Sequence, residues 1–177
     1  MRGWLLVVCA CGRIDFGQTQ HVEYVATVAE CLNPSAPDPA KCRSVNGAKQ
    51  LVIDQMDSAT MNPWYGYIRF DPAVTGELVS ATLRMVATTD AKADAPGSGE
   101  VWEVTAFTLA DLSTTTPTPV RMLAIDPGPI VPDQVVEWPL GTTTVPSYFG
   151  IYPTNTDGTN YWNLDGTDPP RLLVDYR

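Results

Sequence analysis

Apolar and polar residues alternate with a period of two in several short segments of this chain. The alternation is clearest within 64–70, 78–88 and 171–176. Because successive side chains of a β-strand point to opposite faces, each of these segments places a row of apolar side chains on one face. Comparable segments recur along the chain and predict about nine short strands. Their expected ranges are 23–29, 50–54, 64–70, 78–88, 100–107, 120–125, 134–140, 147–152 and 171–176.

Proline and glycine interrupt the chain wherever a long helix could otherwise form. The sequence holds 16 prolines and 13 glycines, and these are spread along its length. The one helical candidate, 107–112, is about one and a half turns long. Short strands joined by loops predict an all-β fold, in which two antiparallel sheets pack face to face as a jelly-roll-like β-sandwich. A chain of 177 residues suits a single domain of this kind.

The first 12 residues, MRGWLLVVCACG, combine one basic residue, a short apolar run and a cysteine that follows a small residue. This order is similar to the signal of bacterial lipoproteins, in which the cysteine after the cleavage site is acylated and becomes the new N-terminus. Cys11, which follows Ala10, is therefore the predicted lipid-attachment residue. A buried first strand is the alternative interpretation of this segment.

The lipoprotein interpretation divides the chain into a signal peptide at 1–10, a tether at 11–21 and the β-sandwich domain at 22–177. It predicts a location in the bacterial cell envelope, where the lipid anchors the protein to a membrane and the domain is periplasmic or surface-exposed. The apolar run is too short for a transmembrane helix, which needs about 20 apolar residues. The net charge of −9 disfavours nucleic acids and acidic polysaccharides as partners, because both are bound mainly through Lys and Arg.

Cys31 and Cys42 enclose ten residues, LNPSAPDPAK, of which three are prolines. In an oxidising compartment this pattern predicts a disulfide that closes a loop, with two free thiols as the alternative. Closing so short a loop would contribute up to about 3 kcal/mol to stability. His21 is the only histidine, so the chain cannot assemble a zinc site from Cys and His side chains.

The side chains that catalysis needs are scarce. A serine or cysteine nucleophile requires a nearby base, which is nearly always histidine. The only histidine is His21, and the sequence contains no G-x-S-x-G motif that would supply a nucleophilic serine. Glu100 and Glu103, which flank Trp102, are the best candidates for the paired carboxylates of a glycosidase. Residues three apart on a strand point to opposite faces, however, so these two carboxylates cannot flank one bond, and Trp102 is expected in the core. The sequence therefore predicts a protein that is not an enzyme.

The segment 153–170 is rich in the hard oxygen ligands that calcium binds. Asp157, Asp165 and Asp168 are the candidate ligands. Their spacing does not fit the EF-hand loop, and Asp-Gly pairs also form tight turns, which is the favoured interpretation. No other cofactor is expected.

Three segments carry a resemblance to a known family. They are YIRFD at 67–71, VSATLRM at 79–85 and GIYPTNTDGTNYWNLDGTDPPRLLVDY at 150–176. In this order they resemble the DNRLRE domain, which is related to carbohydrate-binding module family 96, over 22–176. The family's Ser-Arg-Glu triplet is replaced here by Trp-Asn-Leu at 162–164. The resemblance implies a β-sandwich of secreted or surface proteins, with polysaccharide binding in some members.

Loop aromatics supply the candidate ligand-binding residues. Sugar rings stack on Trp and Tyr, while carboxylates hold the hydroxyl groups. Trp64 and Tyr65 at the entry of one strand, and Tyr161, Trp162 and Asp165 in the last loop, have this chemistry, with core packing of each ring as the alternative. We expect a non-catalytic envelope domain that binds an extracellular or cell-wall polysaccharide. The alternative is a purely structural or adhesive surface domain without a small-molecule site.

Overall fold

Short β-strands form most of the regular structure in the computed structural model, which describes residues 18–56, 63–73 and 75–177. The described part also contains one α-helix, α1 (Pro39–Asn46), and two 3-10 turns, η1 (Ala91–Ala93) and η2 (Asp111–Ser113). The strands are β1 (Gln20–Val25), β2 (Val28–Leu32), β3 (Gln50–Ile53), β4 (Tyr65–Arg69), β5 (Leu78–Val86), β6 (Glu100–Val104), β7 (Pro119–Ala124), β8 (Val135–Pro139), β9 (Tyr148–Tyr152), β10 (Thr159–Trp162) and β11 (Arg171–Tyr176).

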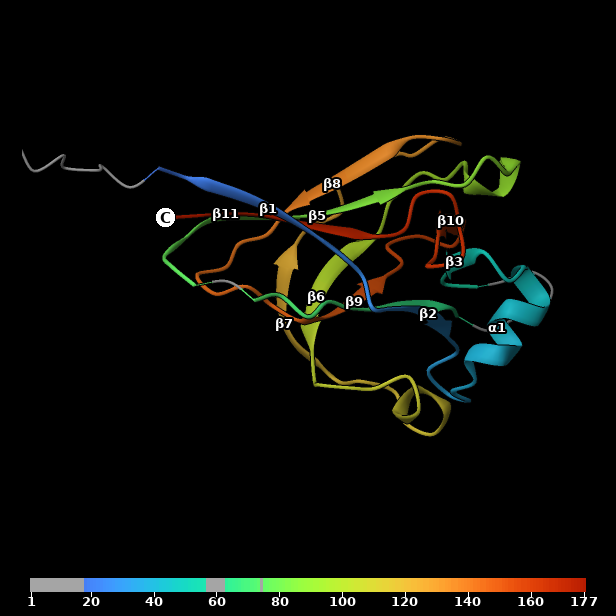
Figure 1. The fold of residues 1–177 in the computed structure, drawn as a ribbon. Helices are drawn as coiled ribbons and strands as arrows, with labels where there is room; N and C mark the ends of the chain where they lie inside the picture. Colours follow the sequence, from blue (N-terminus) through green and yellow to red (C-terminus); the bar gives the residue numbers. More distant parts are fainter. Residues whose placement is uncertain (1–17, 57–62, 74) are drawn as a thin grey trace, which may run out of the picture.

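Two antiparallel sheets form a β-sandwich, which confirms the predicted all-β fold (Figure 1). One sheet has the order β1-β11-β5-β8, and the other has the order β2-β4-β9-β6-β7. Strands β3 and β10 form a separate pair, which Figure 1 shows beside α1 at one end of the molecule. Isolated bridges from Asp54 to Trp64 and from Ala87 to Tyr161 connect this pair to the segments that flank β4 and β5. The small sheet therefore joins the ends of the two larger ones.

The main core lies between the two large sheets and follows from the period-two pattern of their strands. Phe149 of β9 is fully buried, and its ring meets that of Phe70 edge-on at a centroid distance of 5.5 Å. Trp138 of β8 is also buried, and its indole N–H donates a hydrogen bond of 2.9 Å to the carbonyl oxygen of Gly99. Other fully buried side chains in this core are Ile68, Leu83, Val101, Ile151, Leu172 and Val174. Burial of this apolar area is the main stabilising contribution to the sandwich.

The predicted strand at 23–29 is in fact two strands, β1 and β2, which belong to different sheets. The chain crosses between the sheets at Ala26 and Thr27. The amide of Ala26 donates to the carbonyl of Pro170, next to β11, whereas the amide of Thr27 donates to the carbonyl of Arg69 on β4. The sequence pattern does not reveal this crossing, because Tyr24 of β1 and Ala29 of β2 both contact the main core.

The segment between the cysteines, expected to be a loop, contains the first turn of α1, which continues past Cys42. The Asp38 carboxylate accepts hydrogen bonds from the amides of Ala40 and Lys41, and Pro39 occupies the first turn. Gly47 ends the helix with a φ of 107°, which favours glycine. This combination of a capping Asp, a first-turn Pro and a final Gly is a helix signal that the sequence contained. By contrast, the helical candidate at 107–112 contains only the start of η2.

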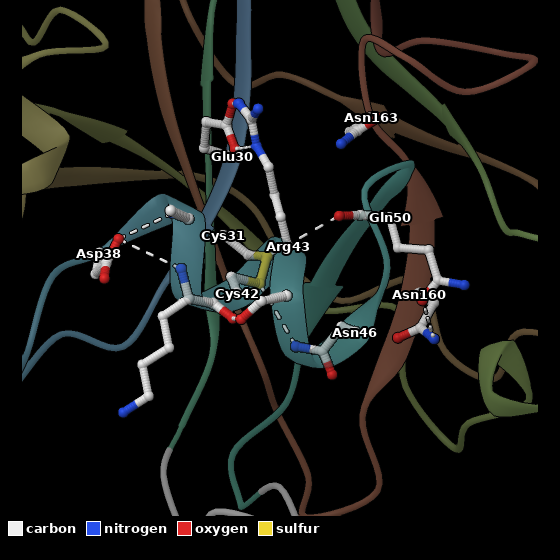
Figure 2. Close-up of a disulfide and its surroundings, with 12 residues drawn as sticks. Glu30, Cys31, Asp38, Cys42, Arg43, Asn46, Gln50, Asn160 and Asn163 are labelled. Carbon is white, nitrogen blue, oxygen red and sulfur yellow. Dashed lines mark hydrogen bonds and ion pairs between the residues drawn. A yellow bond between two sulfur atoms is a disulfide. The ribbon is translucent and has the colours of Figure 1, made fainter.

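A disulfide joins Cys31 on β2 to Cys42 on α1, as predicted, with a Cα–Cα distance of 5.9 Å. Figure 2 shows a second connection directly beside it, between Glu30 and Arg43. The Arg43 Nε atom donates to the carboxylate at 2.9 Å, and a second guanidinium nitrogen contacts the other carboxylate oxygen. Glu30 is 5% exposed, so its charge is compensated inside the protein. Two adjacent side-chain links therefore hold α1 against the edge strand of the five-stranded sheet.

Replacing both Cys31 and Cys42 with alanine is expected to lower the free energy of unfolding by about 3 kcal/mol, because the unfolded chain loses a short closed loop. Urea denaturation measures this change. Asp38→Ala is the control within the same helix and should cost only about 1 kcal/mol, through loss of the N-cap. An unchanged urea midpoint in the double variant would contradict the prediction.

Candidate functional site

Aromatic side chains cover the outer face of the five-stranded sheet, the face turned away from the main core. Tyr65 of β4 and Tyr152 of β9 lie side by side, with ring centroids 4.9 Å apart and planes at 64°. Trp102 of β6 lies on the other side of Tyr152, at a centroid distance of 6.3 Å and an angle of 83°. Glu100 is the register partner of Tyr152 and shares this face. Neighbouring strands thus bring three rings and a carboxylate together.

The segment 105–118 covers one part of this outer face. Its Phe107 is buried against Tyr67 at a centroid distance of 6.1 Å and against Tyr148 at 5.4 Å. Leu112 of η2 is fully buried in the same cluster, which forms a second, smaller core. Tyr65, Trp102 and Tyr152 pack against this cluster but are only half-buried. The segment 105–118 and its cluster therefore leave part of each of these three rings exposed.

A hollow of about 300 Å³ lies where the cover ends, and we call it the aromatic groove. It combines aromatic and proline surfaces with one carboxylate and one amide. Among the residues that the structure describes, its lining includes no Lys, Arg or His. The lining residues are Gln55, Tyr65, Glu100, Trp102, Pro119, Tyr152 and Pro153.

The rings of the aromatic groove are held in place by local contacts. The indole N–H of Trp102 donates a hydrogen bond of 2.8 Å to one carboxylate oxygen of Glu100, two residues earlier on the same strand face. Gly150 makes room for the Tyr152 ring, because a Cβ there would lie 2.7 Å from a ring carbon of Tyr152 and 2.8 Å from a methyl carbon of Val104. A glycine in the middle of β9 is therefore a packing requirement of the site.

Burial raises the pKa of two tyrosine phenols on this face. It raises the pKa of Tyr152 to about 12, and the neighbouring Tyr65 and Glu100 act in the same direction. Burial also raises the pKa of Tyr67 well above its usual value, with Tyr152 adding to the effect. Near neutral pH both side chains therefore keep the hydroxyl proton, and Glu100 is the one acidic or basic residue among the described residues that line the groove.

Of the five residues expected to bind sugar, Tyr65 is the one that lines the aromatic groove. Trp64 is 1% exposed and packs with the disulfide in a small core cluster. Tyr161 is fully buried, and its hydroxyl donates to the carbonyl of Ser98 at 2.8 Å. Neither ring has a face open to a ligand, which corrects the expectation for these two residues. Trp162 is half-buried and Asp165 is exposed, both away from the groove lining.

Glu100, Trp102 and Tyr152, the other main groups of the aromatic groove, were not among the residues predicted to bind sugar. Trp102 was expected in the core, whereas its ring is half-buried on the outer face. A usable signal was present, since 148–152 (YFGIY) and 100–104 (EVWEV) carry large apolar side chains on both faces. Strands of this kind indicate a sheet that is covered on both sides.

The three candidate calcium ligands do not form a site. The described residues contain no group of three or more His, Cys, Asp or Glu side chains placed to hold a metal ion, so Asp157, Asp165 and Asp168 are not brought together. The loop instead contains two Asx turns. The side-chain oxygen of Asn155 accepts from the amide of Asp157 at 3.1 Å, and that of Asn163 accepts from the amide of Asp165 at 2.9 Å. Asn155 and Asn163 therefore form turns in this loop, with Asp157 and Asp165 as the residues that donate the amide hydrogen bonds.

His21, Asp175 and Ser80 form a row across β1, β11 and β5 on the outer face of the four-stranded sheet. The Ser80 hydroxyl donates to Asp175 at 2.6 Å, and His21 Nδ1 lies 2.8 Å from the other carboxylate oxygen. The Ser80 hydrogen bond and then His21 lower the pKa of Asp175. The carboxylate thus separates the hydroxyl from the imidazole, whereas an activated serine must contact its base.

Glu100 and Glu103 have separate partners, in keeping with their spacing on β6. Glu100 accepts from Trp102 on the outer face, while Glu103 forms an ion pair with Arg121 of β7 at 2.6 Å. The two carboxylates do not share a site.

The predicted lipid-attachment residue, Cys11, lies outside the described residues, as do the whole of 1–10 and most of the predicted tether. Within the described ranges, no helix is both long and apolar enough to cross a membrane.

A scan against models of protein families finds no match to this chain, and a search of curated proteins finds none either. The candidate function therefore rests on the chemistry of the aromatic groove.

Gly150→Ala is expected to destabilise the protein by about 1–3 kcal/mol, because the added methyl group overlaps the Tyr152 ring. Urea denaturation gives the energy, and near-UV circular dichroism reports the displaced ring. Gly141→Ala is the matched control, since its nearest neighbour would be a carbonyl oxygen at 3.4 Å, and it should change stability by less than about 0.5 kcal/mol. Equal effects of the two substitutions would show that Gly150 has no special packing role.

Proposed function

We propose that this chain is a non-catalytic carbohydrate-binding domain of a bacterial cell-envelope lipoprotein, and that it holds polysaccharide in the aromatic groove. One observation carries the proposal: three partly exposed aromatic rings lie beside a carboxylate and an amide in a single hollow. The apolar faces of sugars stack on aromatic rings, and carboxylate and amide groups bind their hydroxyls. The groove offers both kinds of contact at once.

The position of the aromatic groove supports binding without a large conformational change. Tyr65, Trp102 and Tyr152 lie on three neighbouring strands rather than on loops. Their rings contact one another, so little side-chain entropy is lost when a ligand binds. The volume of about 300 Å³ lies at the lower end of small-molecule sites, which suits a short part of a polymer.

The sequence adds two supporting features. The resemblance of 22–176 to DNRLRE domains favours polysaccharide as the ligand, and the lipoprotein-like start favours a cell-envelope location where such polymers occur. A non-catalytic role is supported by the arrangement of the candidate acids and bases. Ser80 hydrogen-bonds Asp175 instead of His21, and Glu100 and Glu103 have different partners.

A second candidate function is that of a structural or adhesive surface domain. The observation that favours it is a row of exposed apolar side chains on β7 and just after it: Val120, Met122 and Ile125. A groove of about 630 Å³ lies beside this row, between β7 and β8, which are edge strands of the two sheets. Exposed apolar surface of this kind is typical of protein contacts.

Trp102→Ala is expected to weaken polysaccharide binding about tenfold, because one stacking surface is lost, corresponding to ~1.4 kcal/mol. A glycan array with the full chain identifies the ligand, and calorimetry measures the affinity of each variant. Trp162→Ala is the matched control and should bind as the unmodified protein does, since Trp162 does not line the groove. Loss of binding in the control alone would place the site in the last loop instead, and binding to no glycan would favour the adhesive function.

Cys11→Ser is expected to release the protein from membranes, because the acylated thiol is lost. Cell fractionation with labelled palmitate measures both the location and the acylation. Cys9→Ser is the control, since it changes the neighbouring thiol and leaves Cys11 in place. Retention of the Cys11 variant in the membrane fraction would contradict the predicted anchor.

A further inference from the structure

The aromatic groove carries a negative charge that the protein itself only partly uses. One carboxylate oxygen of Glu100 accepts the indole hydrogen bond of Trp102. No described residue donates to the second oxygen, and no described cation pairs with this carboxylate. Because Glu100 is only half-buried and lines the hollow, a ligand can reach the free oxygen. The groove therefore has an acceptor available for a positively charged donor.

The rings of the groove add to the attraction for a cation. Tyr65, Tyr152 and Trp102 meet at angles of 64° and 83°, so the groove is bounded by aromatic surfaces of different orientation. A cation within about 6 Å of such a ring is attracted by its π electrons, and tryptophan gives the strongest attraction. An ammonium group near Glu100 would also lie close to Trp102, since their side chains are hydrogen-bonded.

The described arginines do not oppose this attraction, and no described lysine lines the groove. All six arginines in the described part of the chain form ion pairs with Asp or Glu. Arg121, the arginine on the strand next to β6, is paired with Glu103. The net charge of −9 further favours the approach of cations and disfavours acidic ligands.

We infer that the aromatic groove selects polysaccharides that carry protonated amino groups, such as glucosamine polymers, over neutral and acidic ones. The ammonium group of the sugar contacts Glu100 and the face of Trp102, while a sugar ring stacks on the tyrosines. This inference rests on the proposed function and names the ligand class of the same groove.

The test compares oligomers of equal length and different charge by calorimetry with the full chain. Glucosamine oligomers, measured at mildly acidic pH, are expected to bind about fivefold or more tightly than N-acetylglucosamine oligomers. Galacturonate oligomers are expected to bind most weakly. The difference between the charged and the acetylated ligand should shrink at high ionic strength, because salt screens the interaction.

Two matched substitutions identify the source of the selectivity. Glu100→Gln keeps an acceptor for the Trp102 indole and for sugar hydroxyls but removes the charge, so it should abolish the preference for glucosamine by weakening binding of glucosamine oligomers more than that of acetylated ones. Glu103→Gln removes the same charge from the same strand outside the groove lining and should leave the preference intact.

The outcomes separate this inference from the function on which it rests. Binding of neutral oligomers that depends on Trp102 but shows no preference for glucosamine would overturn the inference and leave the proposed function standing. Equal effects of the Glu100 and Glu103 substitutions would also overturn it, because the attraction would then come from overall charge. Binding to none of the oligomers, together with a glycan array that shows no ligand, would overturn both.

Discussion

Both faces of the five-stranded sheet are apolar, and the need to bury two faces determines where the rest of the chain lies. The inner face carries Ile68, Phe149 and Ile151 and packs against the four-stranded sheet. The outer face carries tyrosines and a tryptophan, and in the part of the chain that the structure describes the segment 105–118 covers one part of it. Tyr65, Trp102 and Tyr152 remain only half-buried and form the wall of the aromatic groove. The aromatic groove is thus the exposed part of the apolar cluster on the outer face of the sheet.

Two side-chain links stabilise the edge of the five-stranded sheet in addition to apolar packing. The disulfide between Cys31 and Cys42 and the ion pair between Glu30 and Arg43 fasten α1 to β2, an edge strand of this sheet. Because β2 is also the register partner of β4, which carries Tyr65, these links stabilise the strand array on which the aromatic groove is built.

The period-two pattern predicted the sandwich and most strands, because burial on one face leaves a signal in every short segment. It could not show which face of a doubly covered strand meets the main core, and so Trp102 was assigned to the wrong side while Val101 occupies the core. Strand β10 was missed because its turn-forming residues obscure a strand that pairs only with β3. The rings of Trp64 and Tyr161 looked available because the sequence gives no sign of the small sheet that buries them.

The central claim is that the uncovered part of the outer face, rather than the last loop, receives the ligand. The indole N–H signals in a nitrogen-correlated NMR spectrum report this directly, because each tryptophan contributes its own resonance. Titration with a bound oligosaccharide is predicted to shift the Trp102 indole signal and to leave those of Trp138 and Trp162 in place. A shift of the Trp162 signal with an unchanged Trp102 signal would contradict the account.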